Sequence, residues 1–245
     1  MRRVVSHYLP LLLIALAWEG IARLDLFASL PAPSAIIVSW WHLLMAGDLI
    51  ANGLASVYRG VVGLALAIVV GSALGIAMAW WRGAHFLLNP IVELTYPLPK
   101  SALIPVTAIW LGYGDSSKIL LIFLGCMLPV TIGAYNGARS TEEVLIWSAR
   151  GMGASRLRTL WDIAVPSALP ELFNGIRVAI ALSFVLLVSA ELIVARAGFG
   201  YLIGLLGASG AYTPMFAVVL TVAFLGFAAD RLYVLAAGRI LQWRE

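Results

Sequence analysis

The chain has 245 residues, of which 62% are hydrophobic and 11% are charged, and its formal net charge is +4. A soluble chain has about 25% charged residues. A soluble domain of this size could not hide so much apolar surface, so the composition indicates an integral membrane protein made of helices. The only cysteine, Cys126, lies in an apolar run, which excludes a disulfide framework and a cysteine-built metal site.

The N-terminal part, residues 1–51, is expected to hold one transmembrane helix and one outer helix. The first apolar run covers 8–24, and Glu19 and Arg23, four residues apart, are expected to pair on one helix face. A cleaved signal peptide is the rival interpretation. The length of the run, the charges in its last turn and the lack of a clear cleavage site argue against it. Residues 35–45 are too short to span and predict a helix lying on the outer surface.

Residues 52–236 are expected to form one transmembrane domain, followed by a cytoplasmic tail over 237–245. Apolar runs predict five further spans, at about 57–81, 86–110, 119–135, 171–194 and 214–235. Arginines gather in the segments that would share one side: Arg2, Arg3, Arg82, Arg139, Arg150, Arg156, Arg158, Arg239 and Arg244. The positive-inside rule therefore predicts six spans with both termini in the cytoplasm.

A small-residue motif in the second span predicts close packing of helices. Gly71 and Gly75 are four residues apart, which places both on one helix face. Such pairs let two backbones approach each other. By itself the motif carries no information about transport.

The third span, 86–110, is unusual because it contains four prolines. The backbone groups that prolines free at membrane depth must face protein or a wet cavity. Broken helices of this kind often line transport sites, and the alternative is a kink satisfied by neighbouring helices. The candidate transport path consists of Tyr96, Pro99, Lys100, Ser101, Ser183 and Glu191. A structural role for Glu191, either pairing with Arg196 or capping the turn after the fifth span, is the alternative.

The polar interval 139–169, between the fourth and fifth spans, predicts two short helices outside the lipid. Ser140 and Glu143 form a capping-box pattern at the start of the first helix. Gly153 lies in the interruption that follows. Ser155 is expected to cap the second helix.

The spacing within this interval resembles the cytoplasmic "EAA" loop of membrane subunits of binding-protein-dependent ABC importers. The family pattern is Glu-Ala-Ala, three residues, Gly, nine residues, then Ile-x-Leu-Pro. Here the matching residues are Ala149, Gly153, Ile163 and Pro166.

The chain departs from the family pattern at three positions. Trp147 stands where the family has glutamate, Ser148 replaces the first alanine, and Val165 replaces the leucine. Glu142 and Glu143, one turn earlier, are candidates to replace the missing glutamate.

The resemblance implies coupling to an ATPase through Trp147, Ser148, Ala149, Arg150, Gly153, Ala154, Ser155 and Arg156, with Ile163 and Pro166 shaping the loop. For Arg150, Arg156 and Arg158, topology and lipid headgroup contact are equally weighted alternatives.

A second resemblance narrows the family. The run 97–112, with Pro97, Pro99 and Lys100, is similar to the third-span segment of the sulfonate, nitrate and taurine permease subfamily, and 198–203 resembles the outer turn after the fifth span. The resemblance covers about 54–235. It implies an all-α membrane protein of the ABC transmembrane type-1 fold, with six helices and a cytoplasmic coupling helix between spans four and five.

No residues for ATP hydrolysis are visible. Neither lysine, Lys100 or Lys118, ends a phosphate-cradling Gly-x-x-x-x-Gly-Lys-Ser/Thr motif, and no Ser-His-Asp set or metal cluster is seen. We therefore expect that this chain is not an enzyme and holds no cofactor, and that a partner ATPase binds ATP and magnesium.

The resemblance implies a permease of the bacterial inner membrane that works by alternating access. The implied partners are a second copy of the chain, two ATP-binding cassette subunits, a periplasmic or lipid-anchored solute-binding protein and membrane lipid, without nucleic acid. The implied cargo is an aliphatic sulfonate, taurine or nitrate. A thiamine-pyrimidine precursor or another aromatic compound is the alternative. Two other classes of protein are remote alternatives. One is a secondary transporter or channel, which would need an internal repeat or paired buried acids, and the other is a non-transporting membrane scaffold.

Overall fold

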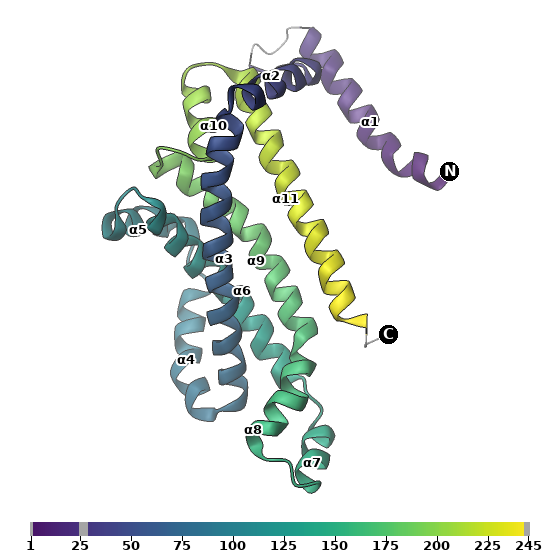
Figure 1. The fold of residues 1–245 in the computed structure, drawn as a ribbon, viewed down its shortest axis with the longest axis vertical. Coiled ribbons are helices and arrows are strands. Elements are labelled where there is room, and N and C mark those ends of the chain that lie inside the picture. The colour runs from purple at the N-terminus through teal and green to yellow at the C-terminus, as the bar shows by residue number, and fades with distance from the viewer. Residues whose placement is uncertain (1, 25–28, 243–245) are drawn as a thin grey trace.

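The computed structural model describes residues 2–24 and 29–242, and all secondary structure in these residues is helical (Figure 1). The α-helices are α1 (Arg2–Arg23), α2 (Pro33–Ala46), α3 (Asp48–Trp80), α4 (Arg82–Thr95), α5 (Leu103–Leu111), α6 (Asp115–Arg139), α7 (Glu143–Gly151), α8 (Arg156–Thr159), α9 (Val165–Val194), α10 (Phe199–Ala208) and α11 (Tyr212–Ile240). A 3-10 turn, η1 (Lys100–Ala102), precedes α5, and a π-helix, η2 (Leu160–Ala164), joins α8 to α9.

Four helical runs in the described part of the chain are long and apolar enough to cross a membrane: α3, α6, the run Arg156–Val194 that contains α9, and α11. Helices α2 and α10 lie at one end of the molecule, and α7 and α8 lie at the other (Figure 1). The expected first span falls on α1, and the expected third span is divided between α4 and α5. The all-helical membrane fold is therefore confirmed, while the count of six spans stays a prediction.

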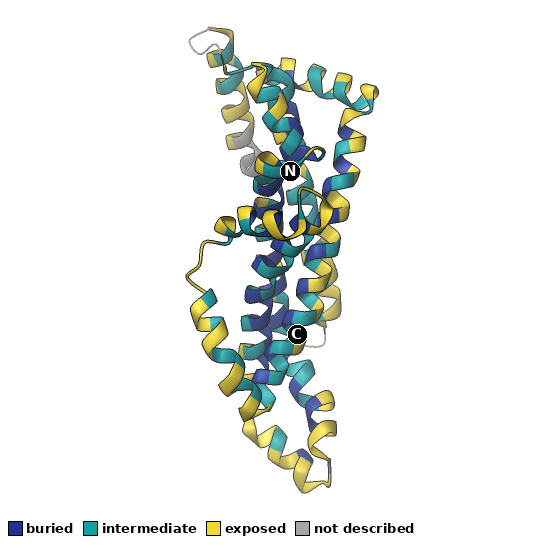
Figure 2. Ribbon diagram, turned by 90° about the vertical axis from the view of Figure 1, so that its left-hand side faces the viewer, coloured by how far each residue is buried: buried dark blue, intermediate teal, exposed yellow. Residues whose placement is uncertain are grey.

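Helices α3, α6 and α9 form the central bundle, where buried residues concentrate (Figure 2). Glycines bring these helices close together. A Cβ atom at Gly71 of α3 would lie 2.8 Å from the Met127 carbonyl oxygen, and one at Gly133 of α6 would lie 2.6 Å from the Glu171 carbonyl oxygen. Larger side chains would force the backbones apart. The close packing expected at Gly71 and Gly75 is confirmed.

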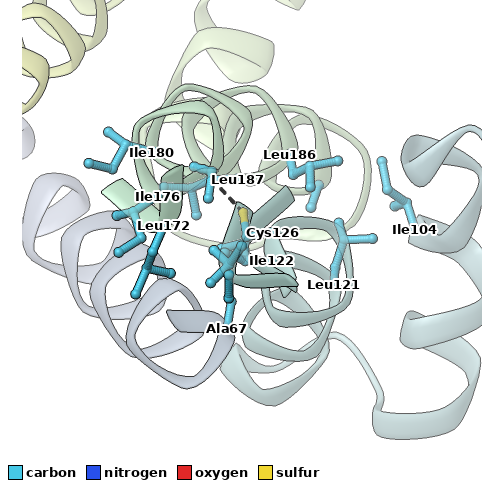
Figure 3. Packing of buried hydrophobic residues seen from close by; sticks show 14 residues of the cluster. Ala67, Ile104, Leu121, Ile122, Cys126, Leu172, Ile176, Ile180, Leu186 and Leu187 are labelled. Atoms are coloured by element: carbon cyan, nitrogen blue, oxygen red, sulfur yellow. Dashed lines mark hydrogen bonds between the residues drawn. The ribbon is translucent and has the colours of Figure 1, made fainter. Parts of the chain in front are cut away.

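The centre of the bundle is an apolar cluster around Cys126 (Figure 3). Ala67 of α3, Ile122 of α6 and Leu187 of α9 belong to this cluster. The Cys126 thiol is fully buried and donates a hydrogen bond of 3.3 Å to the Ala179 carbonyl oxygen. Cys126 is therefore a packed core residue.

The break in the third segment coincides with two prolines. Helix α4 ends at Thr95, and η1 begins at Lys100, so Pro97 and Pro99 lie in the non-helical residues between them. Proline has no N–H to donate and disfavours helical geometry at the residue before it. The third segment therefore consists of two short helices, and the carbonyl groups at the end of α4 are left without helical partners.

Helix α1 is fixed to the start of α2. The Glu19 carboxylate accepts hydrogen bonds from the Ser34 backbone N–H (3.0 Å) and hydroxyl (2.7 Å), which caps α2. Glu19 also forms an ion pair of 2.7 Å with Arg23, so the pair expected from their spacing is confirmed. Beyond this joint, α1 lies away from the central bundle (Figure 1).

Candidate coupling loop and transport route

The loop after α6 starts differently from the sequence prediction. Helix α7 begins at Glu143, with Glu142 as its N-cap residue, and no side chain caps it. The Ser140 hydroxyl instead donates to the Gly137 carbonyl oxygen of α6 at 2.8 Å. The capping box expected from Ser140 and Glu143 is therefore wrong, because the end of α6 uses the serine hydroxyl.

The turn between α7 and α8 depends on Gly153. Its φ of +88° lies in the left-handed region that favours glycine. The next residue, Ala154, donates its backbone N–H to the Ala149 carbonyl oxygen at 3.0 Å, which closes the end of α7. The Ser155 side chain accepts a hydrogen bond of 3.2 Å from the Arg158 backbone N–H, so the predicted cap of the second helix is confirmed.

Helix α7 lies at the tip of the molecule, where exposed residues dominate (Figure 2), and some of its exposed residues are apolar. Val144 is 67% exposed and Trp147 is 66% exposed. These two residues are three apart, so they lie side by side on the helix surface. Ala149 is buried on the opposite side, and Ser148 and Arg150 are exposed. We call Val144 and Trp147 the apolar ridge of α7, and a ridge of this kind typically marks an interaction surface.

The loop arginines have different surroundings. The Arg156 guanidinium donates to the Trp80 carbonyl oxygen at 2.9 Å, so it joins α8 to the end of α3. Arg158 pairs with Asp162 at 3.2 Å. Among the described residues, Arg150 has neither an ion pair nor a side-chain hydrogen bond. Arg156 is thus already engaged within the chain, whereas Arg150 is free to contact another molecule.

The π-helix η2 contains Ile163, one of the residues that match the family loop. Leu160 and Ala164 are buried, and Ile163 is half-buried. Pro166 lies two residues into α9 and has no N–H for the Asp162 carbonyl oxygen. The wider π turn accommodates the proline ring, and such turns are frequent at functional positions in helices.

A cavity of about 490 Å³ opens beside the break in the third segment. Residues of the break, α6 and α9 line it: Tyr96, Leu98, Lys100, Gly125, Leu128, Pro129, Ile132, Gly133, Asn136, Glu171, Asn174, Gly175, Val178 and Leu182. We call it the route cavity. Of the residues proposed for the transport path, Tyr96 and Lys100 line this cavity, while Pro99 and Ser101 are exposed in the same turn.

Lys100 satisfies the carbonyl groups that the broken helix leaves free. Its ammonium donates to the carbonyl oxygens of Thr95 (2.5 Å), Leu98 (2.8 Å) and Tyr96 (3.3 Å). A cation at the C-terminal end of a helix also interacts favourably with the helix dipole. Lys100 therefore holds the break in shape and places a positive charge at the route cavity.

Three polar residues of the route cavity were missed by sequence reasoning. Asn136, Glu171 and Asn174 are exposed, and none of their side chains has a hydrogen bond or ion pair among the described residues. The available signal was the spacing of Glu171 and Asn174, which places both on one helix face. Asn136 lies on another helix, and only the packing of α6 against α9 brings it alongside.

Ser183 lies outside the route cavity. Its hydroxyl donates to the Ile180 carbonyl oxygen at 2.7 Å. It lines an apolar cavity of about 350 Å³ formed by α3, α9, α10 and α11. Ser183 therefore does not share a cavity with Tyr96 and Lys100.

Glu191 is fully buried in a group of polar contacts near the start of α10. Its carboxylate accepts from Arg59 Nη1 (2.6 Å), the Ser56 hydroxyl (2.8 Å) and the Gly200 backbone N–H (3.1 Å). Of the two structural alternatives for Glu191, capping the turn is confirmed. Pairing with Arg196 is wrong, because Arg59 of α3 occupies that role.

The surroundings of Glu191 balance its charge. Arg59 also pairs with Asp115 of α6 at 2.7 Å, and the buried Lys118 donates to the carbonyl oxygens of Tyr113 (2.6 Å) and Val194 (2.5 Å). The buried charges of Arg59 and Glu191 are thus paired, and the buried Lys118 ammonium is satisfied by backbone carbonyl oxygens, as buried charges require. This ionic cluster of Arg59, Asp115, Lys118 and Glu191 ties α3, α6 and α9 together near α10.

The described residues contain no group of three or more His, Cys, Asp or Glu side chains that could hold a metal ion. What they contain is a cavity between the broken third segment, α6 and α9, with several polar residues in its wall, and, at one end of the molecule, a helix with an exposed apolar ridge. Broken helices that border a cavity often line the transport sites of membrane transporters.

Comparison with known proteins identifies the family. Residues 67–242 match the model of the binding-protein-dependent transport system inner membrane component, and the chain belongs to this family. It is the multi-pass membrane permease subunit of an ABC importer.

Several transport permease proteins are similar to this chain over most of its length. The taurine transport system permease protein TauC of Escherichia coli is 33% identical, with 92% of this chain and 85% of that protein covered. The putative aliphatic sulfonates transport permease protein SsuC of Bacillus subtilis is 30% identical, with coverage of 97% and 86%. The formylaminopyrimidine transport permease protein ThiX of Halalkalibacterium halodurans is 30% identical, with coverage of 75% and 74%.

A solved structure has the same fold. A chain of the MetNI methionine ABC transporter, in an inward-facing conformation, superposes with a TM-score of 0.67 at 20% identity, covering 81% of this chain and 96% of that chain. The type-1 permease fold expected from the sequence is confirmed.

Proposed function

We propose that this permease imports a small oxoanion, namely an aliphatic sulfonate, taurine or nitrate, by alternating access through the route cavity. The observation that carries the proposal is the cavity itself, where Asn136, Glu171 and Asn174 have no protein partner among the described residues. Polar groups left unpaired on a cavity wall indicate that the cavity holds water or polar cargo. Similarity to taurine and sulfonate permeases covers more of the chain than similarity to the pyrimidine permease, which supports an oxoanion as cargo.

The energy for transport comes from a separate ATPase. The apolar ridge of α7, together with Ser148, Arg150 and the turn around Gly153, forms its docking surface. ATP and magnesium are bound by that partner, and this chain needs no cofactor of its own. Closure of two ATPase subunits draws the two coupling loops together, which favours the outward-open state. Each state is stabilised by different contacts, as a ligand-driven shift requires.

A second copy of the chain completes the route. The route cavity is open on one side, and α4, which borders the break, has no buried residue. A homodimer with its two-fold axis along this open side would enclose the cavity between two copies. A periplasmic or lipid-anchored binding protein delivers the cargo at the α2–α10 end.

The orientation follows from charge. The arginine-rich loop 139–169 lies at the α7–α8 end (Figure 1), so we place this end in the cytoplasm together with both termini. The bacterial inner membrane is the corresponding location.

The test is to purify the tagged chain from its native host in a mild detergent and identify what co-purifies. We expect a stoichiometric ATPase and a solute-binding protein to co-purify with the chain. That binding protein is then titrated with taurine, ethanesulfonate, nitrate and a formylaminopyrimidine. Preferential binding of the pyrimidine would replace the oxoanion proposal with the aromatic one. Recovery of the chain alone would contradict the proposed assembly.

A further inference from the structure

The two charged residues of the route cavity lie at different depths. A Cβ atom at Gly125 would lie 3.7 Å from Lys100 Cβ, whereas a Cβ atom at Gly137 would lie 3.0 Å from Glu171 Cβ. Gly125 and Gly137 are both on α6, and a helix rises about 1.5 Å per residue. The two positions on α6 against which Lys100 and Glu171 pack are therefore roughly 18 Å apart along that helix. Lys100 is nearer the α10 end, and Glu171 is nearer the α7 end.

The Glu171 backbone is held in place while its carboxylate is free. Its carbonyl oxygen packs against Gly133, where a Cβ atom would lie only 2.6 Å away. The side chain is exposed and has no partner among the described residues. A free carboxylate on a fixed backbone position exerts its charge on the cavity that it faces.

Glu171 also lines a second cavity of about 250 Å³ at the root of α7, together with Thr141, Glu142 and Ser167. The same side chain thus borders the route cavity and the space under the coupling helix. Neither cavity is lined by Arg139, the basic residue in the last turn of α6. The route cavity therefore ends, on the side of α7, at a negative charge with no lining cation beside it.

We propose that Glu171 is an electrostatic exit residue, which keeps anionic cargo that has already reached the cytoplasm from binding back into the inward-open route. This inference rests on the proposed import of an oxoanion and on the α7 end facing the cytoplasm. Lys100 attracts an anion in the upper part of the route. Glu171 repels one at the inner mouth, and a homodimer would place two such carboxylates there.

Ionic screening sets how strongly the Glu171 carboxylates repel an anion. Charges about a Debye length apart, roughly 8 Å at physiological ionic strength, still interact in a water-filled mouth. With the dielectric constant of water, two carboxylates at such distances lower the local concentration of a monovalent anion about twofold. Binding from the cytoplasmic side weakens by the same factor.

The experiment measures how strongly cargo enclosed in the vesicles inhibits uptake. The complete complex is reconstituted into vesicles, and ATP-driven uptake of labelled ethanesulfonate is followed with increasing unlabelled ethanesulfonate enclosed. We expect Glu171→Gln to lower the half-inhibitory internal concentration about twofold relative to wild type, and to lose most of this difference in high salt. Glu171→Asp, which keeps the charge, should behave like wild type.

Two further variants keep the test decisive. Asn174→Asp adds a carboxylate one turn along α9 and should raise the half-inhibitory concentration, so the inference is testable even if Glu171→Gln fails to assemble. Glu93→Gln is the matched control, because Glu93 is an exposed carboxylate on α4 that lines neither cavity and accepts a hydrogen bond from Asn89.

Unchanged inhibition in Glu171→Gln, or equal shifts in Glu171→Gln and Glu93→Gln, would overturn the exit role while leaving import intact. Absence of oxoanion uptake by the wild-type complex would overturn the proposed function, and the exit role with it. The two failures are therefore distinguishable.

Discussion

At the scale of single residues, we expect substitutions in the ionic cluster to cost the most folding free energy. Glu191 is fully buried, and the Arg59 side chain that neutralises it is 7% exposed. Removing one partner of a buried pair leaves an uncompensated charge, which costs about 3–5 kcal/mol. The cluster therefore acts as a fixed joint at the start of α10.

Arg59→Met should strongly destabilise the protein, because Glu191 loses its counter-charge while keeping its buried position. The measurement is thermal unfolding in detergent. Arg23→Met is the control, because the Glu19–Arg23 pair is surface-exposed and such pairs contribute about 0–1 kcal/mol. Equal stability of the two variants would contradict the role of the ionic cluster.

Trp147 occupies the position where the related loops have glutamate. Because this side chain is the largest on the apolar ridge, Trp147→Ala should weaken co-purification of the ATPase at least tenfold, with the permease still folded. Quantitative pull-down in detergent checks this. Trp110→Ala on α5 removes an equally exposed tryptophan (69%) far from the loop and should leave ATPase recovery unchanged. Normal ATPase recovery with Trp147→Ala would show that the ridge is not the docking surface.

At the scale of elements, the coupling loop is joined to two membrane helices. Through η2 it continues into α9, and through the Arg156 contact with the Trp80 carbonyl oxygen it reaches the end of α3. We therefore expect movement of α7 and α8 to be transmitted to both α3 and α9. Both helices pack closely against α6 through glycines, and they also contact each other.

Arg156→Met should lower the uptake rate several-fold while leaving ATPase binding close to wild type, because it cuts the link to α3 but not the apolar ridge. Uptake and pull-down are measured on the same preparation. Arg158→Met, which breaks only an exposed pair with Asp162, is the control. Loss of ATPase binding in Arg156→Met would mean instead that Arg156 contacts the partner.

Sequence patterns predicted local features well and long-range partners poorly. The Ser155 cap, the Glu19–Arg23 pair and the packing at Gly71 each depend on residues close in sequence or on one helix face. The partner of Glu191 is Arg59, 132 residues away. No periodicity within one segment encodes that contact. Asn136 and Glu171 meet in one cavity only because glycines set how α6 lies against α9.

At the scale of the whole molecule, the ionic cluster and the coupling loop are well separated. Helices α2 and α10 lie at one end, and α7 and α8 lie at the other (Figure 1). The ionic cluster contacts the start of α10, and the route cavity is lined by α6 and α9 between that cluster and the coupling loop. The only cysteine, Cys126, is fully buried, so the native chain has no exposed thiol. This provides a direct way to determine orientation.

Ser148→Cys on α7 should react with a membrane-impermeant maleimide only in inside-out vesicles, and Ser209→Cys beyond α10 only in right-side-out vesicles. Both serines are exposed. Labelling efficiency by mass shift checks this, with the native chain as the unlabelled control. The reverse pattern would place the coupling loop outside and contradict the cytoplasmic assignment.

The most direct test of importer function is uptake by vesicles that hold the permease and its ATPase, with the binding protein added outside. The account predicts accumulation of labelled taurine or ethanesulfonate that requires internal ATP and the binding protein and is lost in Trp147→Ala. Uptake that runs down the cargo gradient without ATP or ATPase would contradict it, and would show that the chain works as a channel.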